Sequence, residues 1–335
     1  MTGFAGKLAL AGVFAFLIGS SATAEEWKFA IEEIPGSIMD SYAQEFKKRI
    51  ETATGGEVTV SIYPLGSLGT PTEVAEQTAD GVVHLSNLSV GNLGTLVPES
   101  QIFLSTYMFP SDPAQVNSVL AESPTVHDDL AQDFASKGLK LGALYSEGEQ
   151  VWTTSKEIRT PEDMANFKMR VMVSPMLLKA YEDLGASPTP IPFGEVYGAL
   201  QLGQVDGQVN PVPTIQEMKF YEVTDDMIWA GEQQLITAVM ASDDWFQTLS
   251  PEYQQLLDKT FAEMNAFITP VVQKFNADRL DAIKTAKPDI GLIELSEDER
   301  AAFRERASAT DAAVAEIVGP RGAELLESLK AEFAR

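Results

Sequence analysis

Cysteine is absent from the 335 residues of the chain, and histidine occurs only twice. Without a thiol the protein has no disulfide, no thiolate ligand for zinc, no thiol nucleophile and no cysteine for an N-terminal lipid anchor. His84 lies in an apolar strand-like segment, and His127 stands beside acidic residues on a predicted helix face. We expect both histidines to be structural or solvated, and we predict neither a metal site nor a cofactor.

Sequence motifs of enzyme chemistry are also missing. The chain has no G-x-S-x-G turn for a nucleophile, no P-loop and no G-x-G-x-x-G loop for a dinucleotide. Acidic pairs such as Asp225-Asp226 lack the ligand spacing of a calcium loop. We therefore predict that the protein is not an enzyme, with a hydrolase that uses an unrecognised pair of carboxylates as the enzymatic alternative.

Positive charge is scarce, since 24 Lys and Arg face 49 Asp and Glu and the net charge is −25. A protein this acidic repels phosphate backbones and anionic membrane surfaces, so nucleic acid and membrane insertion are not expected. If the ligand is an anion, the protein needs local positive charge to hold it. Any arginine at a strand end is therefore informative.

Long hydrophobic runs are confined to the N-terminus. Lys7 precedes an apolar run from Leu8 to Ile18, and an A-x-A cleavage pattern ends at Ala24. This pattern is typical of a secretory signal peptide, and the run is too short for a permanent membrane anchor. We predict export to the periplasm with cleavage after Ala24; an uncleaved anchor or a buried helix is the alternative.

The remaining chain alternates strands and helices. Strand-like and helix-like segments follow each other as β-α-β-α-β from Trp27 to Leu88, and a second such unit begins near Gly148. The segment Met227 to Ala241 is apolar and strand-like, and a helical pattern runs from Ser250 to about Lys287 with a kink or break expected at Pro270. We predict an α/β protein of two lobes with mostly parallel sheets: 25–147 plus about 236–275, and 148–235 plus about 276–335.

Arg170 and Asn210 are the most informative polar residues. In the strand 168–173 the odd-numbered residues are apolar, so Arg170 points to the other face, and Ser174-Pro175 ends the strand directly after it. Open α/β sheets bind ligands at the carboxyl ends of their strands, and arginine suits a carboxylate or sulfonate. Asn210 is held in extended backbone by Pro211. A solvated arginine and a loop asparagine are the structural alternatives.

Several motifs resemble the substrate-binding proteins of TRAP transporters, the DctP-type family. They are spread over nearly the whole chain after the signal segment. The matching segments are Leu65 to Gly69, Glu76-Gln77, Ile158 to Asp163, Lys179 to Tyr181, Leu184 to Pro190, Phe193 to Tyr197, Ala199 to Gln201 and Val205 to Pro211.

This resemblance implies a type II-like periplasmic-binding-protein fold, with a long helix that spans both lobes and a ligand cleft between them. The family's anion-binding arginine falls on Arg170, its ligand-binding asparagine on Asn210, and the residue that covers the ligand on Phe193. The implied partners are a small organic anion or zwitterion and the small and large permease subunits. We expect a monomer that closes on its ligand.

The segments Trp27 to Glu33, Ala43 to Phe46 and Glu147 to Glu149 resemble the ectoine-binding branch of the family, although the chain also departs from that branch. Glu33 stands where that branch binds the ligand's cationic end, while its three aromatic cage positions fall on Asn92, Phe193 and Leu235. Gln150 replaces the second arginine of many members.

Val209 replaces the glutamate of the usual D-G-Q-E-N-P motif. Trp152 or Trp229 would have to supply the missing aromatic contact, although core packing is the alternative for each. For Glu33, a solvated loop position is the alternative.

The predicted function is a periplasmic receptor that delivers a carboxylate, sulfonate or zwitterion to an ion-gradient-driven TRAP permease. A receptor for an ABC importer and a ligand-sensing adaptor are the alternatives among binding proteins. A neighbouring ATPase gene would favour the importer.

Overall fold

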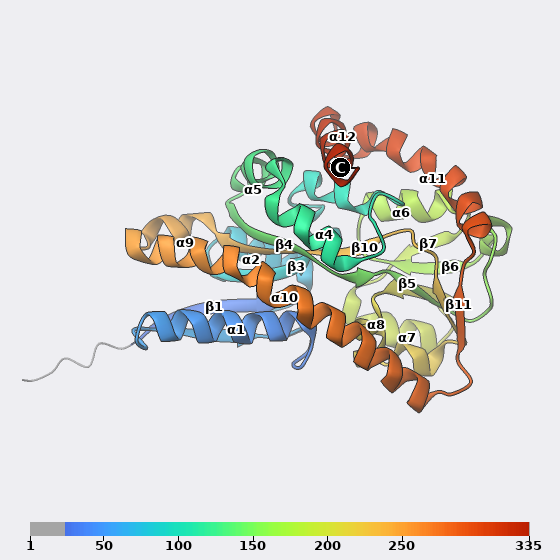
Figure 1. Ribbon diagram of the computed structural model, residues 1–335, viewed down its shortest axis with the longest axis horizontal. Helices are drawn as coiled ribbons and strands as arrows, with labels where there is room; N and C mark the ends of the chain where they lie inside the picture. The colour runs from blue at the N-terminus through green and yellow to red at the C-terminus, as the bar shows by residue number, and fades with distance from the viewer. Residues whose placement is uncertain (1–23, 335) are drawn as a thin grey trace, which may run out of the picture.

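The computed structural model describes residues 24–334, and the predicted signal segment before Ala24 lies outside these residues. Two mixed β-sheets, each covered by helices, form two lobes (Figure 1). None of the helices in the described part of the chain is both long and apolar enough to cross a membrane. The predicted two-lobe α/β fold is confirmed.

The first sheet forms lobe I and has the strand order β2-β1-β3-β10-β4. β1 is parallel to β2 and β3, whereas β10 is antiparallel to both β3 and β4. Its strands are β1 (Glu25–Ile31), β2 (Val58–Tyr63), β3 (Leu85–Ser89), β4 (Leu139–Glu149) and β10 (Gln234–Ser242).

The second sheet forms lobe II and has the order β11-β9-β5-β8-β6-β7. The antiparallel pairs in the two sheets all involve β4, β5 or β10, the strands that flank the crossings between lobes. Its strands are β5 (Val151–Thr154), β6 (Lys168–Val171), β7 (Ser187–Pro190), β8 (Gly207–Asn210), β9 (Asp226–Trp229) and β11 (Gly291–Glu294).

Helices cover both sheets (Figure 1). The α-helices are α1 (Ile38–Ala53), α2 (Pro71–Ala79), α3 (Val90–Leu93), α4 (Pro113–Glu122), α5 (Ala131–Ala135), α6 (Pro175–Asp183), α7 (Val196–Gln201), α8 (Val212–Glu217), α9 (Asp243–Thr248), α10 (Pro251–Ala286), α11 (Glu297–Ile317) and α12 (Pro320–Phe333). The other helical segments are four 3₁₀ helices and one π-helix (η2) among the described residues. They are η1 (Pro98–Leu104), η2 (Thr125–Leu130), η3 (Pro161–Met164), η4 (Phe193–Glu195) and η5 (Phe220–Val223).

Helix α10 is the long helix expected to span both lobes. It packs against α1 and β4 of lobe I and against α8 of lobe II. Its 36 residues include Pro270, and the helix continues through this proline rather than breaking there. An internal proline removes one backbone hydrogen bond, and the extensive packing of α10 on both lobes compensates for that loss.

The apolar segment 227–241 does not form one strand. It contains β9 of lobe II and β10 of lobe I, and residues 230–233 between them cross from one lobe to the other. A second crossing joins β4 to β5 at Gln150. Apolar runs alone do not show where a strand leaves one sheet and enters another, so the pattern missed the crossing.

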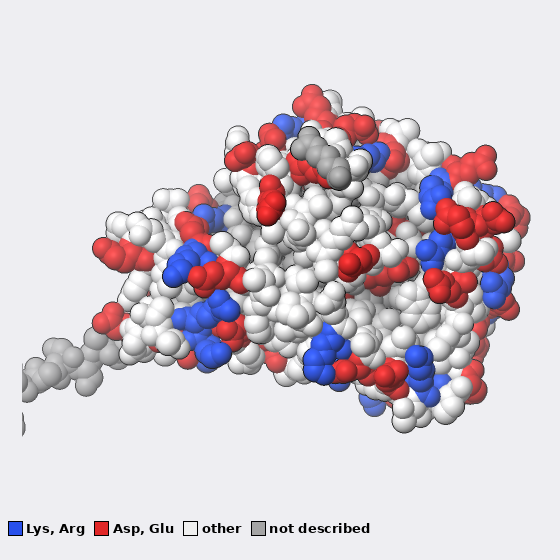
Figure 2. Space-filling view, in the orientation of Figure 1, with Lys and Arg blue, Asp and Glu red and all other residues white. Residues whose placement is uncertain are grey.

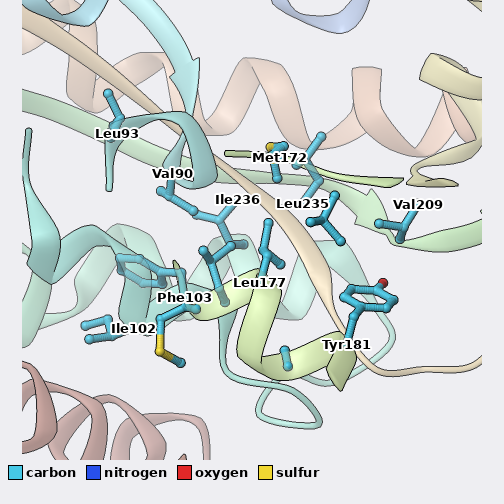
Figure 3. Close-up of a cluster of buried hydrophobic side chains, with 14 of the residues drawn as sticks. Val90, Leu93, Ile102, Phe103, Met172, Leu177, Tyr181, Val209, Leu235 and Ile236 are labelled. Atoms are coloured by element: carbon cyan, nitrogen blue, oxygen red, sulfur yellow. The ribbon is translucent and has the colours of Figure 1, made fainter. Parts of the chain in front are cut away.

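Three apolar clusters form the core. One lies on the α1 side of lobe I, one on the α7 side of lobe II, and the largest draws side chains from both lobes. Figure 3 shows Leu235 and Ile236 of β10 in the shared cluster with Met172 and Leu177 of lobe II. The lobes therefore share an apolar core on one side.

Charged side chains of both signs are spread over the visible face of the molecule, with red and blue groups close together (Figure 2). Arg49, for example, pairs with Glu45 and Glu263, and Arg321 pairs with Asp129. These surface ion pairs neutralise part of the negative charge, and each pair contributes little to the stability of the fold.

Candidate functional site

A small cavity lies between the two lobes. In this structure the cavity is nearly closed, since the room it leaves for the centre of a water-sized sphere is about 10 Å³, about enough for one water molecule. A bound solute therefore requires the lining side chains or the two lobes to move apart. Its lining consists of Glu32, Glu33, Asn92 and Leu235 from lobe I and Arg170, Met172, Phe193, Asn210 and Thr214 from lobe II.

Arg170 is the cationic group of the cavity. Its Nε and Nη2 atoms both donate to the Ile191 carbonyl oxygen, at 2.9 and 2.8 Å, which fixes the plane of the guanidinium. Burial lowers the pKa of Arg170 to about 10, so the group stays charged at neutral pH. The remaining N–H groups are available to bind a carboxylate in two-pronged geometry.

Asn210 ends strand β8, directly before Pro211. Its Nδ2 donates to Gln208 Oε1, and Gln208 Nε2 in turn donates to Thr153 Oγ1 at 2.8 Å. Gly207 begins the strand because a Cβ there would lie 2.7 Å from the Thr153 carbonyl oxygen. The asparagine is thus oriented by a hydrogen-bonded chain and a tight strand pair.

Phe193 supplies the aromatic wall on the lobe II side. It lies in η4, is 9% exposed, and meets Phe220 edge to face with ring centroids 6.3 Å apart. The contact with Phe220 holds the ring in place over the cavity.

Glu33 lines the cavity from the loop between β1 and α1, and both of its carboxyl oxygens accept hydrogen bonds. Oε2 accepts from the Met39 backbone N–H and Oε1 from Thr214 Oγ1 of lobe II, each at 3.3 Å. Burial raises the pKa of Glu33. Because Glu33 is only 5% exposed, the solvated alternative does not describe its position.

Glu32, Thr214 and Met172 also line the cavity, and the sequence motifs did not identify them. Glu32 is held by Asn92, whose Nδ2 donates to Glu32 Oε2 and to Ser89 Oγ, each at 3.1 Å. Burial raises the pKa of Glu32 to about 7. Neighbouring residues of a strand point to opposite faces, but Glu32 and Glu33 lie just past the end of β1, where that rule lapses.

Gln150 and Trp152 lie outside the cavity lining, and so does Trp229. Gln150 is buried at the β4–β5 crossing, where its N–H donates to the Gln233 carbonyl oxygen. The Trp152 indole N–H donates to Glu232 Oε1 at 2.6 Å, and its ring meets Phe303 edge to face. The structure thus brings together six of the eight predicted site residues, and Trp152 has core contacts.

The histidines have the structural and solvated positions expected of them. His84 Nδ1 accepts from the Lys28 backbone N–H, and its ring stacks on Trp245. His127 is exposed. Within residues 24–334, no group of three or more His, Cys, Asp or Glu is arranged to hold a metal ion.

Comparisons with known proteins agree with this site. Residues 29–316 match the model of the family described as bacterial extracellular solute-binding protein, family 7. The chain is 38% identical over 331 residues to the ectoine/5-hydroxyectoine-binding periplasmic protein UehA of Ruegeria pomeroyi, covering 98% of this chain and 96% of that protein.

Two solved structures show the same fold. One is the periplasmic ectoine-binding protein of the TeaABC TRAP transporter of Halomonas elongata, with a TM-score of 0.89, 35% identity, and coverage of 92% of this chain and 99% of that one. The other is a TRAP periplasmic solute-binding protein of Desulfovibrio salexigens with bound orotic acid, with a TM-score of 0.87, 30% identity and the same two coverages.

Proposed function

Because the chain belongs to family 7 of the bacterial extracellular solute-binding proteins, we propose that it carries a small zwitterion of the ectoine type. The family membership itself makes it the substrate-binding receptor of a TRAP transporter and not an enzyme. It binds a small organic solute and works with the membrane permease subunits of that transporter.

One observation carries the ligand class: Arg170 and Glu33 line the same small cavity from different lobes. An arginine and a glutamate in one cavity suit a solute with one anionic and one cationic group. A ligand that bridges the two would also hold the lobes together.

We assign each of the other lining residues to a different part of the ligand. Arg170 anchors the carboxylate or sulfonate, Asn210 orients it and Phe193 covers it, while Glu33 binds the cationic group. Asn92 and Leu235 occupy two of the three cage positions, so one aromatic ring rather than three lines this cavity. Gln150 and Trp152 have no contact role in this proposal.

Asn92 is a candidate for selectivity within the ligand class. Its Nδ2 is used by Glu32 and Ser89, which leaves Oδ1 to accept from a hydroxyl or N–H of the solute. We propose that this asparagine favours a polar substituent where an aromatic residue would favour an apolar ring face.

Export completes the proposal. The named relatives are periplasmic proteins, which supports the same compartment for this chain, and we propose that its N-terminal segment is a signal peptide cleaved after Ala24. We propose 25–147 plus about 236–275 as lobe I and 148–235 plus about 276–335 as lobe II, with the first limit extended to Glu149 and the second segment of lobe I beginning at Gln234, because β4 ends and β10 begins there. The intact mass of the exported protein would fix the cleavage site.

The ligand class is tested with a panel of purified solutes. Ectoine, 5-hydroxyectoine and glycine betaine represent zwitterions, and succinate and orotate represent plain anions. We expect a zwitterion to raise the Tm most, because a ligand that binds only the folded protein stabilises it by mass action. A panel in which only plain anions raise the Tm would overturn the zwitterion proposal.

The variant Glu33→Gln tests whether the protein binds a zwitterion or a plain anion, because the substitution should change only the affinity for a zwitterion. The substitution removes the charge but keeps the shape, so we expect affinity for the zwitterion to fall by about 1.5–3 kcal/mol, the usual contribution of a hydrogen bond to a charged group. Affinity for a plain anion should not fall. Calorimetric titration of both proteins with both ligands measures the difference, and equal losses for both would exclude a cation contact at Glu33.

A further inference from the structure

A second carboxyl group lies directly behind Glu33. Glu147 of β4 is 1% exposed, and a hydrogen-bonded chain links it to the loop of Glu32 and Glu33: the Glu32 N–H donates to the Asn87 carbonyl oxygen, Asn87 Nδ2 donates to the Tyr145 hydroxyl, and that hydroxyl donates to Glu147 Oε1 at 3.5 Å. The Glu147 and Glu33 carboxyl groups are hydrogen-bonded to each other, and no N–H or hydroxyl group of the described residues donates to Glu147 Oε2. Glu147 does not line the cavity, so it contacts the site only through Glu33.

Two ionised carboxylates cannot hydrogen-bond to each other, because neither has a proton to donate. Buried carboxyl groups in contact therefore share a proton, since both cannot be charged at that distance. Burial raises the pKa of Glu147 well above its usual value, and the nearby negative charge of Glu33 raises it further.

The surroundings do not supply a compensating cation to Glu147. Glu32 and Glu217 add negative charge, and burial raises the pKa of Glu217 to about 8. Arg279 of α10 is paired with Glu217 at 3.3 Å. Arg170 lies nearer to Glu32, whose charge acts on its pKa.

Two tyrosines complete the environment of Glu147. The Tyr145 hydroxyl accepts from Asn87 Nδ2 at 2.8 Å. The Tyr42 ring stacks on Tyr145, and burial raises the pKa of both phenols, so neither is charged at neutral pH. A proton shared by the two carboxyl groups removes one of their two negative charges without another cation.

We propose that Glu33 and Glu147 share one proton in the ligand-free protein, and that a cationic ligand group at Glu33 displaces this proton as it binds. The inference rests on the proposed zwitterionic ligand. The balance is simple: the ligand's positive charge replaces the proton beside the pair, and the proton leaves to the solvent. A plain anion brings no such charge, so the pair keeps its proton.

Proton release makes the affinities for the two ligand classes depend differently on pH. When binding releases a proton, affinity rises with pH, by up to about tenfold per pH unit while the pair is protonated. Affinity for a plain anion should not rise with pH. Glu147 is thus a positioning residue that sets the charge of Glu33 and with it the selectivity for zwitterions.

Calorimetry measures the released proton directly. The mature protein is titrated with the panel zwitterion that raises the Tm most, at one pH near neutrality in phosphate and in Tris. Because these buffers differ in their enthalpy of protonation, we expect the observed binding enthalpy to differ by the amount for about one released proton.

Glu147→Gln tests where the proton resides. The amide keeps the size and donates a permanent hydrogen bond to Glu33, so we expect the released proton and the rise of affinity with pH both to disappear. Glu149→Gln is the matched control on the same strand. Glu149 accepts from the Gly231 N–H and lies outside the cavity lining, so its variant should release as many protons as the wild type.

Each outcome decides the proposal. A zwitterion that binds with the same enthalpy in both buffers overturns the shared proton but leaves the proposed function intact. A Glu147→Gln variant that still releases a proton also overturns it. Binding of anions alone removes the proposed function instead. If Glu147→Gln does not fold, the affinity of the wild type at pH 6 and pH 8 decides, and no rise contradicts the proposal.

Discussion

The protein buries two clusters of polar groups where its lobes meet, and they differ in one respect. The cavity cluster, defined as Arg170, Glu33 and Asn210, lines the cavity between the lobes. The Glu232 cluster, defined as Glu232, Trp152 and Tyr181, does not line that cavity: Glu232 Oε1 accepts from the Trp152 indole at 2.6 Å and from the Tyr181 hydroxyl at 2.9 Å.

Both clusters contain a buried glutamate with a raised pKa, and for both the largest cause is burial. A raised pKa therefore does not by itself mark the ligand site of this protein. The distinguishing features are the cavity and the opposite charge on the other lobe. Glu232 instead belongs to the crossing between β9 and β10, and its side chain accepts from two residues of lobe II, Trp152 and Tyr181.

The largest effect is expected for Arg170→Ala in the cavity cluster. Removing one partner of a buried charge pair costs about 2–5 kcal/mol, so affinity for the solute should fall roughly 30-fold to several thousand-fold. Arg159→Ala is the control, because Arg159 is exposed and paired with Glu157 and Glu299. Calorimetry that finds equal affinity in wild type and Arg170→Ala would remove the cavity cluster from ligand binding.

A pH effect on stability is expected from the Glu232 cluster. The folded pKa of Glu232 is raised to about 8 from an ordinary 4.5, so its stabilising protonation is complete below about 4.5 and lost as pH rises through 8. The Tm of the wild type should therefore fall by a few degrees between pH 6 and pH 9, with Glu32 and Glu217 contributing in the same direction.

Glu232→Gln isolates this contribution. The amide still accepts from Trp152 and Tyr181 but does not ionise, so the fall in Tm should be smaller while ligand affinity stays the same. If the Tm of the variant falls as much as that of the wild type, the titrating group is not Glu232. If the variant loses affinity for the ligand, the Glu232 cluster also takes part in ligand binding.

The smallest effect is expected for Trp152→Phe. Phenylalanine preserves the aromatic contact with Phe303 but loses the hydrogen bond to Glu232, which should lower the stability by about 1 kcal/mol. Urea unfolding measures this loss, and Tyr181→Phe serves as the matched variant for the other bond. If the variant binds the solute tenfold or more weakly than the wild type, Trp152 contributes to ligand binding.

The sequence identified the main groups of the cavity correctly as neighbours. Arg170, Asn210, Phe193, Glu33, Asn92 and Leu235 all line it. Arg170 follows from strand alternation and the proline that ends its strand, and Asn210 from the proline that follows it. Phe193, Glu33, Asn92 and Leu235 were named through the resemblance to the TRAP family and its ectoine-binding branch.

Contacts between distant segments were not readable. Glu33 meets Thr214 across 181 positions of sequence, and Glu147 of strand β4 lies beside Glu33 of the loop after β1. For Trp152 the sequence favoured core packing over ligand contact, and the hydrogen bond from its indole to Glu232 agrees with core packing. The apolar pattern of 227–241 concealed a crossing between sheets, because burial on both sides removes the alternation that would mark its ends.

The amino-acid sequence by itself determined the fold class, the family and the arginine that lines the cavity, because these depend on periodicity and on motifs within short segments. Only the tertiary structure decided which buried glutamate lines the cavity and which one is held by Trp152 and Tyr181. Burial and charge partners arise from contacts between segments far apart in the chain, and these two quantities set the charge state of a carboxyl group.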